Sequence, residues 1–244
     1  MRSGPGTETW QHRFVSVRPR SSKPGGWGRA SQARAAWSSL PARAPFREGE
    51  GTHPSQHSPV GPAGKIEGGA VRPGMRVLLM PGHLEATVRG LEVDGASCSL
   101  ARAGDTVDLG LTGVEPEQLH TGMVVCSPQF PIRRVKRFQC QAVVVDPPVP
   151  LLRGQGGLLQ AHNARSAAAV TGLIALLDGR TGDVTRQKPR CLLRGSTGLV
   201  EIEVQGDGIC LERYSDYRPL GRIVLRDNGR TVLVGIVTDV LEST

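Results

Sequence analysis

The sequence predicts an all-β fold of two consecutive β-barrels, the first of them incomplete, preceded by a disordered basic tail. Two observations support this prediction. From about residue 63 onward, short runs rich in Val and Leu recur at intervals of roughly ten to twenty residues, with Gly, Pro and Asp between them, as in barrels and sandwiches. Before that point, Pro, Gly, Ser and Arg dominate without any sustained periodicity.

The leader, residues 1–62, is expected to be disordered. It contains nine Lys/Arg and three Asp/Glu, and so carries most of the chain's net charge of +8. The remaining residues are nearly neutral, so the basic character of the whole chain is a weak argument for a nucleic-acid-binding domain. All three tryptophans lie in the leader without apolar neighbours that would bury them, and this composition cannot offset the loss of chain entropy on folding.

One patch of the leader leaves a second interpretation open. In "RASQARAAWSSL" the residues Ala33, Ala36, Trp37 and Leu40 have helical spacing beside two arginines, as in mitochondrial transit peptides. The patch begins late and lies among helix breakers, so a disordered tail is the preferred interpretation. Five cysteines without a CxxC pair indicate free thiols in a reducing, cytoplasmic compartment. No run approaches eighteen apolar residues, which excludes a helical membrane span.

Two sets of strands follow the leader. The first domain is assigned to residues 63–130 and the second to residues 135–242, with "PQFPIRRVKRF" (128–138) as a linker or as the entry to the second domain. The clearest turn is in "LRDNGRTV", where Asn228-Gly229 has the chemistry of a type I′ hairpin. Strands are expected in the following runs: 75–81, 85–93, 105–114, 122–128, 138–146, 167–178, 197–205, 208–214, 221–227 and 231–240.

No catalytic, metal or cofactor site is visible in the residues. A phosphate-binding loop requires GxxxxGK[ST], but the one Gly-Lys pair, Gly64-Lys65, precedes Ile66 and has Pro59 where the first Gly should stand. DxxG and NKxD elements are also missing, so this chain is predicted neither to bind nor to hydrolyse GTP. The basic patch in 133–137 is a candidate RNA contact through Arg133, Arg134, Lys136 and Arg137, with a solvated linker as the alternative.

Several longer motifs resemble one family. "GKIEGGAVRPGMRVLLMP", "ARAGDTVDLGLTG" and "GMVVC" are similar to the second domain of translational GTPases of the elongation factor 1 alpha, release-factor GTPase and Hbs-type class. "TGDVTRQKPRCLLRGSTGLVEIEVQ" and "LGRIVLRDNGRTVLVG" resemble the third domain. The sequence of these motifs is most similar to the Hbs-type ribosome-rescue factor. The resemblance covers about residues 63–242.

The resemblance implies a role in translation through a protein partner. Family members carry two β-barrels after a GTPase domain and dock a tRNA-shaped factor, which for the Hbs-type protein is Pelota, on stalled ribosomes. The family's "GRFxLRD" strand falls on residues 221–227, with Ile223 in place of the usual Phe. Arg222, Arg226 and Asp227 are therefore the expected partner contacts, with Tyr217 beside them. A solvated or internally paired strand face, and a core role for Tyr217, are the alternatives.

The departures from the family pattern shape the remaining expectations. The GTPase domain and the opening strand of the second domain are not seen before "GKIEGG", so residues 63–130 should form a barrel with unpaired edges. The leader resembles what an alternative start or splice junction would append. Three functions stay open: a GTPase-less module that binds a Pelota-like or release-factor-like protein and the ribosome, a piece of an elongation or release factor GTPase, and a non-functional truncated isoform. The second domain has eukaryotic-type sequence motifs, which argue against an organellar elongation factor Tu.

Overall fold

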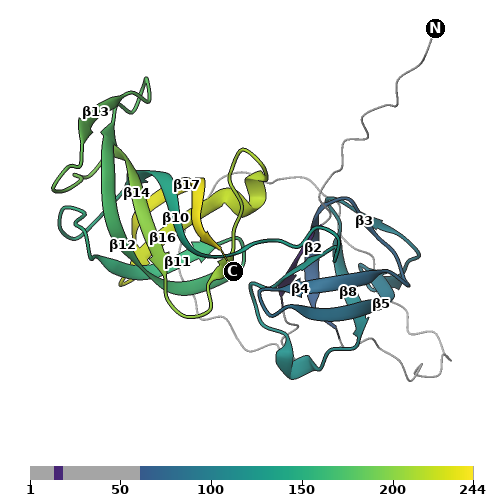
Figure 1. Cartoon of the computed structure of the whole chain (residues 1–244). Helices are drawn as coiled ribbons and strands as arrows, with labels where there is room; N and C mark the ends of the chain where they lie inside the picture. Colours follow the sequence, from purple (N-terminus) through teal and green to yellow (C-terminus); the bar gives the residue numbers. More distant parts are fainter. Residues whose placement is uncertain (1–13, 19–60, 244) are drawn as a thin grey trace, which may run out of the picture.

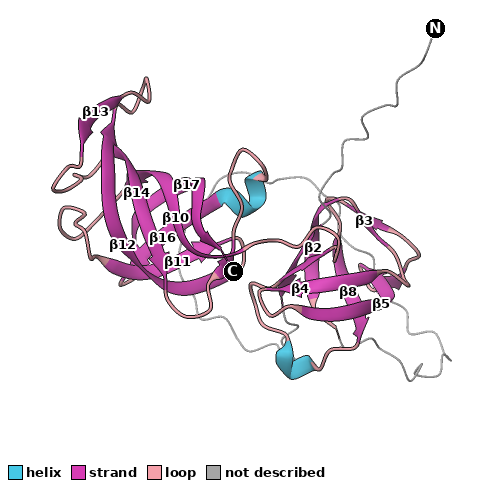
Figure 2. Ribbon diagram, viewed as in Figure 1, coloured by secondary structure: helices cyan, strands magenta, loops and turns pink. Residues whose placement is uncertain are grey.

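The computed structural model describes residues 14–18 and 61–243, and these residues form two β-barrels joined by residues 127–133 (Figure 1). Strands make up most of the described chain. Helical structure in this part is limited to two short 3-10 helices, η1 (Pro116–Gln118) and η2 (Arg218–Gly221) (Figure 2). The predicted all-β class with two consecutive barrels is confirmed.

The first barrel is built on a seven-stranded antiparallel sheet with the order β4-β9-β1-β2-β8-β5-β6, in which β4 also pairs with β5. Two short strands, β3 and β7, form a separate pair beside it. The strands are β1 (Phe14–Arg18), β2 (Ala63–Gly68), β3 (Ala70–Val71), β4 (Arg76–Met80), β5 (Leu84–Val93), β6 (Ala96–Ser97), β7 (Ala101–Arg102), β8 (Thr106–Thr112) and β9 (Val124–Cys126).

Strand β1 comes from the leader, where no strand was expected. It pairs with β2 from Phe14–Gly68 to Arg18–Ala63, and with β9 from Phe14–Cys126 to Ser16–Val124. Within residues 63–130 no strand connects β2 with β9. Residues 14–18 supply the strand between them, in place of the opening strand that was not found directly before "GKIEGG". The expectation of a wholly disordered leader is corrected for these five residues, because open strand edges present N–H and C=O groups that an extended segment can satisfy. Residues 1–13 and 19–60 of the leader lie outside the described ones.

The second barrel is the more regular of the two. Its strands form a continuous ring, β11-β16-β17-β10-β14-β12, which closes because β11 also pairs with β12. Strand β13 extends the sheet from β12, and β15 pairs with β10. The strands are β10 (Arg134–Val144), β11 (Gly156–Ala161), β12 (Ala164–Leu177), β13 (Val184–Gln187), β14 (Thr197–Val204), β15 (Ile209–Cys210), β16 (Arg222–Asp227) and β17 (Arg230–Ser243).

Local sequence explains the last hairpin and the first strand of the second barrel. Asn228 and Gly229 have φ values of 46° and 81°, the positive values that a type I′ turn requires at both central residues. The basic run at 133–137, for which a linker or the entry to the second domain was expected, lies mostly in β10, which begins at Arg134. Val135 and Phe138 of this segment are fully buried, so the strand is fixed by its core side chains although charged residues surround them.

Each barrel has its own apolar core, and a third cluster joins them. This joining cluster consists of Leu78, Met80, Val124 and Cys126 from the first barrel, Ile132 from the connection, and Cys210 and Leu220 from the second barrel. The barrels also approach closely at Gly122 (φ 95°), where a Cβ would lie 2.5 Å from the Cα of Ala164. A larger residue at this position would push the barrels apart, because it would meet backbone and could not repack.

Candidate functional site

The predicted partner-contact residues begin on strand β16. Ile223 and Leu225 are fully buried in the second core, while Arg222, Val224 and Arg226 alternate with them and face outward. Arg222 and Arg226 therefore lie on one face of the strand, as its two-residue period predicts. Ile223, which stands where the family has Phe, fills the core and is not part of the outer surface.

An exposed apolar row lies between the two arginines. The register places Val143 of β10 opposite Val234 of β17, and Val234 opposite Val224 of β16. The side chains of Val143 and Val234 are 45% and 43% exposed, in the middle of a barrel wall. We call Val143, Val234 and Val224 the valine row. The next row on this face aligns Ile236 with Arg222, so a basic residue stands beside the apolar surface.

Arg226 and Asp227 lie next to the turn of the last hairpin. Nη2 of Arg226 donates a hydrogen bond to the carbonyl oxygen of Gly229 at 2.8 Å, and its Nε is buried without an acceptor. Asp227 is half-buried at the end of β16, where it pairs with Arg230 in the backbone register. Arg226 thus supports the turn, whereas Arg222 is exposed at the other end of the strand.

A tyrosine does lie beside Arg222, but it is Tyr214. Its ring centroid lies 5.7 Å from Cζ of Arg222 and 5.8 Å from Cζ of Arg218, within cation–π range. A hydrogen bond from Arg222, with the two positive charges, lowers the pKa of Tyr214. Tyr217 instead packs half-buried against the cluster that joins the barrels, and burial, together with the charge of Glu67, raises its pKa to about 12. The ring contact that the structure shows for Arg222 is thus with Tyr214.

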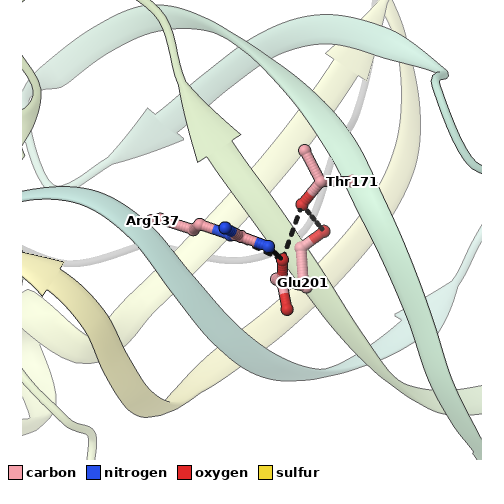
Figure 3. Close-up of polar contacts among 3 residues, drawn as sticks. All are labelled: Arg137, Thr171 and Glu201. Carbon is pink, nitrogen blue, oxygen red and sulfur yellow. Dashed lines mark hydrogen bonds and ion pairs between the residues drawn. The ribbon is translucent and has the colours of Figure 1, made fainter.

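The four basic residues predicted to contact RNA differ in their exposure and partners. Arg137 is bound to Glu201 of β14: its Nη2 forms an ion pair with Oε1, and its Nε donates a hydrogen bond to the same oxygen at 2.6 Å (Figure 3). The hydroxyl of Thr171 donates to that oxygen at 3.1 Å, and the hydrogen bond with Glu201 raises the pKa of Arg137. Arg134 has a buried Nε without a partner, Lys136 is half-buried, and Arg133 is exposed before the strand.

A cleft of about 540 Å³ lies between the barrels, and no sequence motif indicated it. Residues of β2 and β8 line one side, and the β11–β12 turn and η2 line the other. Its charged and titratable lining residues are Lys65, Glu67, His162, Arg218 and Arg222. These residues are separated by up to 157 positions in the chain, so only the folded structure brings them to one surface.

His162 in this cleft is a buried neutral imidazole. Its Nε2 lies 3.2 Å from the carbonyl oxygen of Cys210, which can only accept, so Nε2 carries the proton and Nδ1 is the buried nitrogen without a partner. Burial lowers the pKa of His162 to about 4, although the hydrogen bond to Cys210 opposes the change. The folded state therefore favours the uncharged form of His162.

Folding stability is expected to fall between pH 6.5 and pH 4 because of His162. In this interval the unfolded chain binds a proton that the native imidazole rejects, so the stability that is present above pH 6.5 is lost as the pH decreases. The loss should be about 1.4 kcal/mol per pH unit, and roughly 3 kcal/mol in all. Urea unfolding of the wild type and of His162→Gln across this pH range measures the loss of stability. The difference between the two proteins should change only below pH 6.5, and a pH-independent difference would contradict the assignment.

The described residues contain no group of three or more His, Cys, Asp or Glu side chains placed to hold a metal ion. Within residues 14–18 and 61–243, no helix is both long and apolar enough to cross a bilayer. The surface features that the described residues do show are an apolar row beside an arginine, and a cleft lined by several cations.

Comparison with known proteins assigns both barrels. Residues 62–126 match the family described as elongation factor Tu domain 2, and residues 137–238 match the family described as GTP-eEF1A C-terminal domain-like. The first match ends at Cys126, the last residue of β9, and the second contains Arg137, the valine row and Arg222. Residues 14–18, which supply β1, lie outside both matches.

Similar whole proteins belong to one class of translation factors. The chain is 32% identical to elongation factor 1-alpha of Saccharolobus solfataricus over 73% of this chain and 41% of that protein. It is 34% identical to Protein HBS1 of Drosophila melanogaster (73% and 26%) and 32% identical to the eukaryotic peptide chain release factor GTP-binding subunit of Zygosaccharomyces rouxii (73% and 27%). The chain thus spans about a quarter to two fifths of these relatives.

Solved structures agree with this assignment. Sup35 complexed with GMPPNP superposes with a TM-score of 0.70 at 30% identity, over 74% of this chain and 44% of that one. The complex of sup35 with GDP gives the same TM-score at 29% identity. The chain therefore carries the two C-terminal β-barrel domains of the class of translational GTPases that includes elongation factor 1-alpha, HBS1 and the release factor GTP-binding subunit.

Proposed function

We propose that this chain is a partner-docking module of a translational GTPase that acts in ribosome rescue or termination, with barrel domains at 63–130 and 135–242. It docks a tRNA-shaped protein such as Pelota, or a release factor, on the ribosome in the cytoplasm. It contributes no GTP binding or hydrolysis of its own, because its sequence has no phosphate-binding loop. The observation that carries the proposal is the exposed valine row beside Arg222.

The physical argument is the anatomy of a protein interface. Such interfaces combine an apolar centre, which loses its water on binding, with polar residues at the rim, and arginine is enriched among the residues that dominate the binding energy. The valine row supplies the centre, and Arg222 supplies a rim cation held against Tyr214. Two large side chains exposed by more than two fifths on adjacent strands are costly to leave in water, so a partner that covers them gains hydrophobic free energy.

The similarity to HBS1 and to the release factor GTP-binding subunit supports a role in rescue or termination. HBS1 and the release factor GTP-binding subunit are each about as similar to this chain as elongation factor 1-alpha is. The similarity to elongation factor 1-alpha also supports a second candidate, in which the docked ligand is aminoacyl-tRNA. The two candidates differ in the ligand that the outer face of the second barrel recognises.

Substitution of the outer face is expected to weaken partner binding by about 10- to 100-fold. Calorimetric titration of the whole chain with Pelota, and separately with a release factor of the same shape, measures this for Arg222→Glu and Val234→Asp. Val184→Asp is the matched control, because Val184 is equally exposed but lies on β13 at the edge of the barrel. Equal losses in Val234→Asp and Val184→Asp would refute the docking face. Binding of aminoacyl-tRNA but of neither protein would favour the second candidate.

A further inference from the structure

A second cavity lies beside the connection that joins the two barrels, and it is distinct from the cleft that contains His162. Its volume is about 350 Å³, which is within the range of small-ligand sites. Residues from the stretch 129–133 line one side, and residues from the stretch 212–217, which precedes η2, line the other. None of the lining residues belongs to the valine row or to the cleft. The cavity is therefore a feature that the proposed docking face does not use.

Backbone hydrogen bonds fix both sides of this cavity. The N–H of Phe130 donates to the carbonyl oxygen of Ser127 at 3.0 Å, which closes a turn in the connection. On the other side, the N–H groups of Asp216 and Tyr217 donate to the carbonyl oxygen of Arg213 at 3.0 and 2.9 Å. The lining side chains are therefore carried by ordered turns, which lowers the entropy that a bound ligand must offset.

Two aromatic side chains contribute to the lining. Phe130 is 45% exposed, although phenylalanine is among the residues that are most often buried. Tyr217 is half-buried and packs against the apolar cluster that joins the barrels, so the inner side of the cavity is firm. Burial raises the pKa of Tyr217 to about 12, so its ring remains a neutral phenol near pH 7. The faces of such rings are electron-rich and attract cations.

The charge of the lining is opposite in sign to that of the chain. Glu212 and Asp216 contribute two carboxylates and Arg133 contributes one guanidinium, so the lining has a net charge of −1, whereas the chain has +8. The backbone N–H of Arg133 donates to Oε1 of Glu212 at 3.5 Å, and the hydroxyl of Ser215 donates to Oδ1 of Asp216 at 2.8 Å. These contacts orient the two carboxylates, and a carboxylate offers about four acceptor sites in all.

We propose that this cavity binds an arginine side chain of a protein partner. A ligand that contacts both the rings and the carboxylates must be a cation with a flat apolar surface, and the guanidinium group has both properties. It stacks on an aromatic ring while it donates paired hydrogen bonds to a carboxylate, whereas an ammonium group acts as a point charge. Phe130 and Asp216 are exposed, so the cavity is open to solvent and can receive a side chain that projects from a larger molecule. Nucleic acid is a poor ligand for this cavity, because the carboxylates repel its phosphates.

The test uses the full chain and two small probes, N-acetyl-arginine amide and the corresponding citrulline amide, which has nearly the same shape but no charge. Amide chemical shifts in NMR titrations locate the bound probe and measure its affinity. The arginine probe should shift the amides of residues 129–133 and 212–217, with a Kd on the order of 1 mM for a ligand of this size. The citrulline probe should bind at least about fivefold more weakly, because the rings and carboxylates attract a cation.

Three variants identify the groups that recognise the cation. Asp216→Asn and Glu212→Gln keep the size of the side chain, and each should weaken binding of the arginine probe about three- to tenfold, since each removes a negative charge beside the guanidinium. Phe130→Leu removes the ring but keeps an apolar side chain, and it should weaken binding about threefold. Asp183→Asn is the matched control, because it also removes one negative charge but lies between β12 and β13, outside the cavity. It should leave the Kd unchanged.

Three results would overturn the proposal. Equal effects of Asp216→Asn and Asp183→Asn would show that the probe responds to net charge alone. Equal affinities for the arginine and citrulline probes would show that the cavity does not recognise a cation. Absence of saturable shifts at 129–133 and 212–217 would exclude an external arginine, also if arginines of the chain itself fill the cavity. If Glu212→Gln unfolds the protein, Asp216→Asn decides alone, because Asp216 is exposed. The probes do not include the docked factor, so failure of this inference is distinguishable from failure of the docking face.

Discussion

Replacement of Ser16 by proline is expected to open the first barrel. Ser16 lies in the middle of β1, opposite Lys65 of β2 and opposite Val124 of β9. Proline cannot donate a backbone hydrogen bond and is tolerated only at the edges of sheets, whereas β1 has a neighbour on both sides. The free energy of unfolding should fall by on the order of 3 kcal/mol, the cost of proline inside a regular element.

Hydrogen exchange measures this directly, because it reports each barrel separately. The amides of β2 and β9 should lose protection in Ser16→Pro, while the ring of the second barrel keeps its protection. Open edges of β2 and β9 should also make the variant aggregate at lower concentration. Thr185→Pro is the control, since Thr185 is a bulge residue of β13, which pairs only with β12. Unchanged protection of β2 and β9 in Ser16→Pro would mean that the barrel does not depend on β1.

Strand β1 also marks the limit of what the sequence could predict about the fold. The hairpin at Asn228-Gly229 was predictable, because the turn depends on two adjacent residues and the strands on both sides are rich in Val and Leu. The strand at 14–18 was not, because its partners lie at 63–68 and 124–126, and its own neighbours are typical of a disordered segment. What makes residues 14–18 a strand is an unpaired edge formed by residues far along the chain.

The candidate site was likewise predictable from the sequence only in part. The shared face of Arg222 and Arg226 follows from the period of a strand and was predicted. The valine row was not, because Val143 and Val234 are brought together by the register between β10 and β17. Arg137 and Glu201, 64 positions apart, are likewise paired through the register of β10 with β14. Sequence patterns indicate which face a residue occupies, whereas its partner on that face depends on pairing between distant strands.

Replacement of Arg137 by alanine is expected to destabilise the second barrel, in contrast to the small effect that loss of a solvated RNA contact would have. The side chain of Glu201 is only 11% exposed, and two of the groups that donate to its Oε1 belong to Arg137. Without them, Thr171 alone donates to a covered carboxylate, and a charge left without its partner away from water is strongly unfavourable. Thermal unfolding should show a Tm lower by roughly 5 °C or more.

Two further variants test whether the decrease in Tm comes from the covered carboxylate of Glu201 or from the loss of one positive charge. Arg194→Ala removes the partner of Asp146, an ion pair whose side chains are 74% and 45% exposed, and it should change Tm by about 1 °C or less because solvent screens that pair. The double variant Arg137→Leu with Glu201→Leu should recover most of the loss, since no buried charge then remains. If Arg137→Ala and Arg194→Ala have equal effects, the Glu201 carboxylate is adequately solvated without Arg137. The guanidinium would then be available for an external ligand after all.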